Sequence, residues 1–175
     1  MSSEPVAPTP DDKDWTWVLE RPCPECGFDA SSVTDVADRI RMAIAALQAA
    51  LARPGATDRP QSDVWSPLEY GCHVRDVCIV MGARLAMMRG TDDPLFENWD
   101  QDETARADRY WEQDPAAVSA ALGREGNRLA SDFASVRPDE RDRPGRRSNG
   151  SRFTVDTLGK YCLHDLEHHV HDVTT

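Results

Sequence analysis

The chain has 175 residues, of which 39% are hydrophobic, and it carries a formal net charge of −11. This length fits one domain whose core needs no disulfide support. The acidic balance and the lack of a dominant basic run exclude a protein that binds nucleic-acid phosphates or an anionic membrane surface.

The chain shows no targeting or membrane segment that sequence reasoning can identify. No apolar run approaches the ~20 residues that a membrane-spanning helix requires. The first ten residues are rich in Ser, Pro and Ala and have no apolar signal region. We therefore expect a cytoplasmic protein whose five cysteines are reduced rather than paired.

Composition predicts three regions: a disordered tail over 1–13, an arm over 14–30 and a helical domain over 31–175. In the arm, Trp15 and Trp17 alternate with polar residues, which predicts a short extended segment. The arm ends in a turn-rich knuckle with the sequence Cys-Pro-Glu-Cys-Gly at 23–27.

The first predicted helix covers about 32–52, where apolar residues recur at spacings of three and four. Ser32 and Asp35 resemble a capping box at its start. Pro54 and Gly55 are typical of a helix end.

The second predicted helix has the clearest start in the chain. Ser66 can cap it, Pro67 suits the first helical position, and Glu69 completes a capping box. Apolar residues then follow at helical spacing as far as Gly90, a natural stop. His73 lies at the edge of this apolar stripe.

The rest of the chain adds two further helices. An acidic, aromatic-rich connection over 91–113, with a short helix near 102–111, is typical of a cover over a site. A third helix should run from Asp114-Pro115 to about Val136, followed by a charged loop over 137–151. A fourth should begin near Thr154 and continue to the C-terminus. No alternating strand pattern is evident, so we predict an all-α four-helix bundle with an N-terminal arm.

Histidines gather near the C-terminus. Four of the five histidines lie between Leu163 and Asp172. Histidine is the commonest protein ligand of transition metals, and residues four apart share a helix face. Asp165 with His169, or His164 with His168, could therefore join the isolated His73 in a three-ligand metal site with an open position, the mark of a catalytic centre.

Helical phase favours Asp165 and His169. His169 lies on the apolar stripe of the fourth helix, and Asp165 lies about 60° to its flank. His164 and His168 lie about 120–160° away, toward solvent or another helix. Asp172 could hold a ring nitrogen of His169 from outside the ligand set. Polar residues at a fraying helix end are the competing interpretation.

The segment from Trp65 to His73 (WSPLEYGCH) resembles the second-helix signature of the DinB-like, or YfiT-like, metalloprotein superfamily. The segment Asp165-x3-His169-x2-Asp172 is similar to the fourth-helix pattern of that family, although Asp165 stands where His or Glu is usual. This departure leaves the pair His164 and His168 as an alternative. The resemblance covers about 31–175 and implies an up-down-down-up bundle with three ligands to a divalent metal, zinc or nickel.

Cys23 and Cys26 form one half of a zinc knuckle, and a structural zinc ion needs two more ligands. A pair of reduced thiols in a turn, or a small redox pair, is preferred here to a complete second metal site. A third hypothesis is that the knuckle lends a thiolate to the bundle's metal. The remaining cysteines, Cys72, Cys78 and Cys162, are expected in the core.

Three functions follow from the resemblance and the candidate ligands. The first is a transferase or isomerase that uses a low-molecular-weight thiol such as mycothiol, as in the maleylpyruvate isomerase type of this superfamily. The second is a hydrolase that uses metal-activated water. The third is a non-catalytic metal-binding or small-molecule-binding protein of the stress response. We expect a small-molecule partner and leave a homodimer open.

Overall fold

The computed structural model describes residues 5–10 and 13–175, so the predicted tail at 1–4 and 11–12 lies outside the described residues. Within the described part, no helix is long and apolar enough to cross a membrane. The long helices are α1 (Val36–Leu51), α2 (Pro67–Gly90), α4 (Pro115–Ala134) and α5 (Val155–Thr174).

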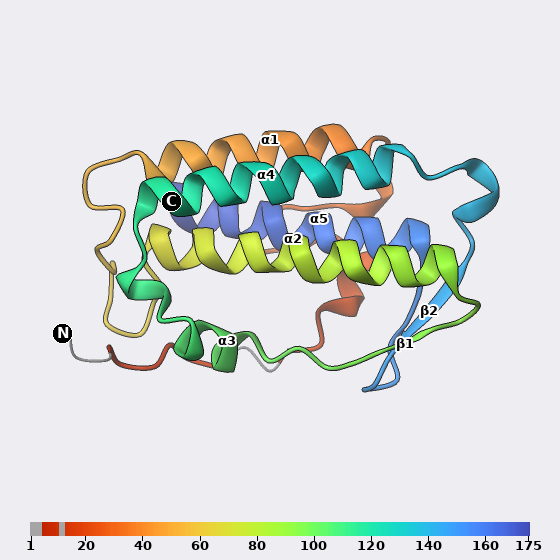
Figure 1. The fold of residues 1–175 in the computed structure, drawn as a ribbon, viewed down its shortest axis with the longest axis horizontal. Helices are drawn as coiled ribbons and strands as arrows, with labels where there is room; N and C mark the ends of the chain where they lie inside the picture. The colour runs from red at the N-terminus through yellow and green to blue at the C-terminus, as the bar shows by residue number, and fades with distance from the viewer. Residues whose placement is uncertain (1–4, 11–12) are drawn as a thin grey trace.

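These helices form the predicted four-helix bundle. Helices α1 and α5 run in one direction, and α2 and α4 run in the opposite direction (Figure 1). Helices α4 and α5 each pack against both α1 and α2. The all-α fold class and its up-down-down-up order are therefore confirmed. The arrangement packs α2 against α5, which carries four of the five histidines.

The start of α2 agrees with the sequence prediction in detail. Ser66 and Glu69 form the reciprocal capping box, and Pro67 is the first helical residue. Glu69 is 1% exposed, and its charge is paired with Arg59, whose Nε donates to Glu69 Oε2 over 2.9 Å. The bonds of the buried Glu69 carboxylate to Ser66 and Arg59 fix the position of the helix start. They therefore also fix the position of His73, four residues later.

The first helix begins later than its sequence suggested. It starts at Val36, where the Asp35 side chain accepts a hydrogen bond from the Asp38 N–H. Ser32 belongs instead to a short 3-10 helix, η2 (Ala30–Ser32), and its hydroxyl donates to the Asp29 carbonyl. Ser32 therefore belongs to the turn that precedes α1, and Asp35 caps the helix in its place.

The arm also differs from its prediction. Trp15 and Trp17 lie in a 3-10 helix, η1 (Trp15–Leu19), rather than in an extended segment. Asp14 explains the difference, because its carboxylate accepts from both the N–H and the hydroxyl of Thr16 and so caps the turn.

The connection from α2 to α4 runs back along the bundle (Figure 1) and contains α3 (Gln101–Ala107) and η3 (Tyr110–Glu112). The predicted helix over 102–111 is therefore broken. Arg109 has a left-handed backbone with φ of 49°, which ends the regular helix between the two segments.

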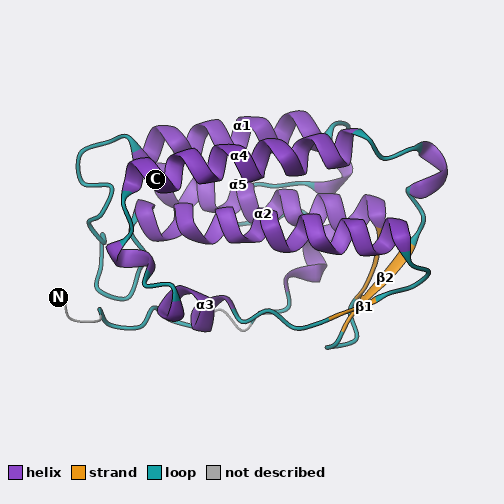
Figure 2. Cartoon of the chain, viewed as in Figure 1, coloured by secondary structure: helices purple, strands orange, loops and turns teal. Residues whose placement is uncertain are grey.

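A small sheet that the sequence did not predict lies at one end of the bundle (Figure 2). Strand β1 (Leu95–Phe96) pairs in parallel with β2 (Pro144–Arg147), which pairs antiparallel with β3 (Arg152–Thr154). The region over 137–151 also contains η4 (Pro138–Glu140). Strands of two to four residues are too short to show an alternating pattern.

The bundle depends on a close approach of α1 and α4 at Gly126. A Cβ atom there would lie 2.4 Å from Ile44 Cγ1. Gly126→Ala should therefore lower the free energy of unfolding by about 1–3 kcal/mol, as measured by urea denaturation. Gly82→Ala is the matched control, because its Cβ would meet only Leu129 Cδ1 at 3.8 Å. That variant should be unchanged or stabilised by about 0.5–1 kcal/mol. Equal effects would contradict the packing.

Candidate metal centre

His73 of α2 faces Asp165 and His169 of α5. The distance from His73 Nε2 to Asp165 Oδ1 is 3.6 Å, and the distance from His169 Nε2 to the same oxygen is 3.0 Å. One donor atom from each of the three side chains lies within 4.8 Å of the other two. Two helices that are far apart in sequence thus bring three candidate ligands to one point.

His73 is buried between aromatic rings. It is 1% exposed, its ring stacks on Trp99 with a centroid distance of 5.6 Å, and the Trp65 ring centroid lies 5.3 Å away. Neither ring nitrogen has a hydrogen-bond partner within the described part of the chain. The contact with Asp165 is too long to count as one. A buried polar group without a partner destabilises the fold. This imidazole therefore fits a site in which a metal ion binds one of its two ring nitrogens.

His169 is held between two carboxylates. Its Nε2 faces Asp165, and its Nδ1 is 2.9 Å from Asp172 Oδ2. Burial lowers the pKa of His169, but hydrogen bonds to the two carboxylates outweigh it and raise the pKa to about 9. Burial likewise raises the pKa of Asp165, but His169 and His73 bring it below its ordinary value. Without a cation the two residues therefore form an ion pair, in which a metal would replace a proton.

The spacing of the donors suits a divalent metal. Zinc ligands lie about 2.0–2.2 Å from the ion, so two ligands of a tetrahedral site stand about 3.3–3.6 Å apart. The distances to Asp165 Oδ1, 3.0 and 3.6 Å, bracket this range. Imidazole nitrogens suit zinc and nickel. Three protein ligands would leave a position for a water or a substrate atom, as in catalytic sites.

A cleft of about 700 Å³ reaches Asp165 and His169. The arm, the connection after α2, strand β2 and helix α5 all contribute to its walls, among them the side chains of Trp15, Trp99, Arg147 and Tyr161. Small-molecule sites in proteins typically measure about 300–1,000 Å³. The cleft is therefore large enough to bring a small substrate to the candidate ligands.

Two residues at this centre were not singled out by sequence reasoning. The Tyr70 ring centroid lies 5.0 Å from that of His169, and burial raises the pKa of Tyr70 to about 12, so its hydroxyl keeps its proton at neutral pH. Trp99 stacks on one face of the His73 ring. The position of Tyr70 three residues before His73 was a usable signal. For Trp99 the only signal in the sequence was that it lies in an aromatic-rich connection.

His164 and His168 lie on the adjacent face of α5. Sequence phase predicted solvent or another helix on this side, and in the structure the arm with η1 covers it, so that His164 is only 4% exposed. The Trp15 ring centroid lies 5.3 Å from that of His164 and 5.2 Å from that of His168. These histidines share a cluster with Cys23 and Cys26, whereas His73 clusters with Asp165 and His169. The remaining cysteines are buried in the core, as predicted.

Comparisons with known proteins agree with this architecture. A family model described as the DinB superfamily matches residues 38–173. The solved structure of YfiT from Bacillus subtilis, described as a probable metal-dependent hydrolase with an unusual four-helix bundle topology, is similar with a TM-score of 0.69 and 16% sequence identity. The similarity covers 78% of this chain and 81% of that chain. No curated protein matches the sequence.

His73→Ala, Asp165→Ala and His169→Ala should each lower the metal content of the purified protein by one ion per chain, because each removes a donor from a three-ligand site. Elemental mass spectrometry measures this loss. His171→Ala is the matched control, since His171 lies on the same helix and belongs to neither cluster. Unchanged metal content in all three variants would rule out this ligand set.

Proposed function

The chain belongs to the DinB superfamily, and on that premise we propose that it is an enzyme in which a divalent ion, bound by His73, Asp165 and His169, activates a small nucleophile. The observation that carries this proposal is the position of two of these ligands in the wall of a cleft of about 700 Å³. A structural site would instead surround its ion with four protein ligands, whereas the three donors here would leave a coordination position open toward the cleft.

The residues around the centre have separable roles. His73, Asp165 and His169 would hold the ion, and Asp172 keeps the His169 ring oriented through its contact with Nδ1. When bound, a divalent ion lowers the pKa of a coordinated thiol or water, so that a nucleophile is available at neutral pH. The rings of Trp65 and Trp99 pack against the His73 ring, which is buried from water.

The finer proposal is a transferase or isomerase that uses a low-molecular-weight thiol similar to mycothiol. It is supported by the resemblance of the segment Trp65–His73 and of the pattern Asp165-x3-His169-x2-Asp172 to the helix signatures of a superfamily that includes thiol-dependent transferases and isomerases. The cleft offers aromatic faces at Trp15 and Tyr161 and a guanidinium at Arg147. These groups suit a polar thiol and an electrophile that carries a carboxylate.

Hydrolysis is the second candidate. Its support is the similarity to YfiT, which is described as a probable metal-dependent hydrolase. Both reactions would use the same metal ligands and would differ only in the nucleophile, a thiolate in one and water in the other. The two are therefore separated by whether turnover requires an added thiol.

The protein reconstituted with zinc or nickel should join a low-molecular-weight thiol to a small electrophile, or isomerise an electrophile only when the thiol is present. The assay follows loss of electrophile across a panel, with and without mycothiol. His73→Ala should abolish turnover. Asp172→Asn should lower metal affinity or turnover about 10–100-fold, because a neutral amide oxygen is a weaker acceptor for the His169 Nδ1–H than the carboxylate that orients the ring.

Turnover of esters or amides without any thiol would favour the hydrolase. If the reconstituted protein turns over neither class although the ion is bound, the enzymatic proposal fails. A non-catalytic metal-binding or small-molecule-binding protein would then be the better account.

Removal of the ion from this centre should stop activity but leave the bundle folded. The core is built from apolar faces of α1, α2, α4 and α5, and fully buried Leu68, Leu122 and Leu158 belong to it. A chelator should therefore abolish turnover while the helical circular dichroism signal remains. Unfolding of the whole chain on chelation would mean that the metal is structural, as in zinc fingers.

A further inference from the structure

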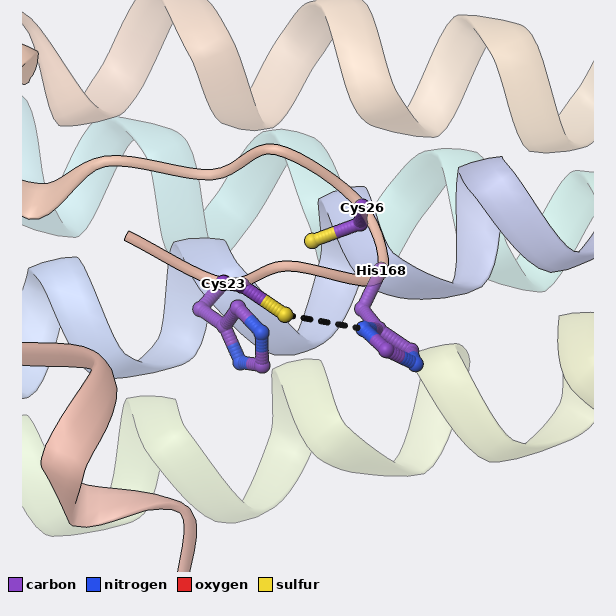
Figure 3. Close-up of side chains that lie close together, drawn as sticks. Cys23, Cys26 and His168 are labelled. Carbon is purple, nitrogen blue, oxygen red and sulfur yellow. Dashed lines mark hydrogen bonds between the residues drawn. The ribbon is translucent and has the colours of Figure 1, made fainter. Parts of the chain in front are cut away.

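The Cys23–Gly27 knuckle folds onto α5 beside His164 and His168. Figure 3 shows the sulfurs of Cys23 and Cys26 and the ring of His168 turned toward one space. One donor atom from each of Cys23, Cys26, His164 and His168 lies within 4.8 Å of the other three. The distance from Cys23 Sγ to His168 Nδ1 is 3.9 Å. A tetrahedral zinc site with these donors needs separations of about 3.3–3.8 Å, so only small shifts are required.

The knuckle has a backbone that suits metal binding before any ion arrives. The Cys23 N–H donates to the Phe28 carbonyl and the Gly27 N–H donates to the Cys23 carbonyl, each over 2.8 Å. Gly27 has φ of +77°, a conformation that side-chain-bearing residues rarely adopt. This tight turn directs both cysteine side chains to the same side.

The histidines are placed as ligands and not as ordinary packing residues. His164 is 4% exposed, and its Nε2 has no hydrogen-bond partner within the described residues. His168 directs Nδ1 toward Cys23, while its Nε2 lies 3.5 Å from Glu25 Oε2. A metal-binding imidazole typically holds its second nitrogen against a carboxylate in this way.

We propose that Cys23, Cys26, His164 and His168 form a second, structural zinc site that is separate from the centre at His73. Two thiolates and two imidazoles are the ligand set that selects zinc in tetrahedral geometry. The spacing Cys-x2-Cys and His-x3-His agrees with closed sites of this type. Each thiol gives up its proton to the solvent when the ion binds.

The site would fasten the arm to the bundle. Four protein ligands leave no position for a substrate, so the ion's role is to hold the knuckle on α5. The arm residues Trp15 and Glu25 lie in the wall of the cleft that reaches Asp165 and His169. Zinc at this position therefore stabilises one wall of the cleft and takes no part in the reaction.

Cobalt substitution tests the proposal without any activity assay. The full-length chain, prepared under reducing conditions and loaded with Co²⁺, should bind two ions per chain and show a thiolate-to-cobalt charge-transfer band. Cys26→Ser and His168→Ala should each lose one ion, and Cys26→Ser should lose or strongly weaken the band. His73→Ala should lose one ion and keep the band. Cys78→Ala and His171→Ala, which alter neither cluster, are the matched controls.

Three results would overturn the second site. One is a wild-type protein without the band. Another is loss of the band in His73→Ala, which would show a single ion shared by both clusters. The third is a Cys23–Cys26 disulfide in protein purified under reducing conditions. If Cys26→Ser does not fold, zinc release from the wild type by a mercurial thiol reagent decides the question. About one zinc released per chain supports the site, and none contradicts it.

Discussion

The arrangement depends on the helical period of α5. Asp165 and His169 form one i,i+4 pair, and His164 and His168 form another that is offset by a single residue. In an α-helix this offset turns the second pair about 100° from the first. One helix therefore presents two pairs of donors to two different partners, α2 on one side and the arm on the other. The packing of α5 against both partners, with His73 at the first contact and Cys23 at the second, completes each cluster.

The two clusters differ in the chemistry that their donors allow. Two imidazoles and a carboxylate beside a cleft leave room for an exchangeable group, which suits a reacting centre. Two thiols and two imidazoles beneath the arm can enclose an ion completely, which suits a structural role. The same cleft is lined by α5 residues from both clusters. A structural ion beneath the arm would thus set the position of groups that a substrate of the first centre contacts.

Much of the bundle could be predicted because helices leave local signals. Ser66, Pro67 and Glu69 gave the start of α2, and apolar spacing gave the four long helices. The start of α1 was misplaced because Ser32 and Asp35 have the spacing of a capping box. In the structure Ser32 belongs to the turn that follows Asp29, and Asp35 itself caps the helix. The sheet escaped notice because its strands are too short to have a period.

The candidate centre was predictable in part for the same reason. The helical phase of α5 placed Asp165 and His169 on one face. The third ligand then had to come from a facing helix, and His73 was the only histidine outside α5. The partners of Cys23 and Cys26 were not predictable in this way. The knuckle and α5 are far apart in the sequence, with the other three long helices between them, and no periodicity relates them. The spacing His164-x3-His168 was the available signal, but it was interpreted as an alternative for the first centre. Burial of His164 by Trp15 and Phe28 is a tertiary contact that no local pattern encodes.

The most direct measurement of the central claim is the crystal structure of the metal-loaded protein, with anomalous scattering recorded at the absorption edge of the bound metal. The account predicts an anomalous peak about 2.0–2.2 Å from one ring nitrogen of His73, one oxygen of Asp165 and one ring nitrogen of His169, with a coordination position open to the cleft. An empty position between these three side chains in metal-loaded crystals would contradict it, as would an ion there that is closed off by a fourth protein ligand.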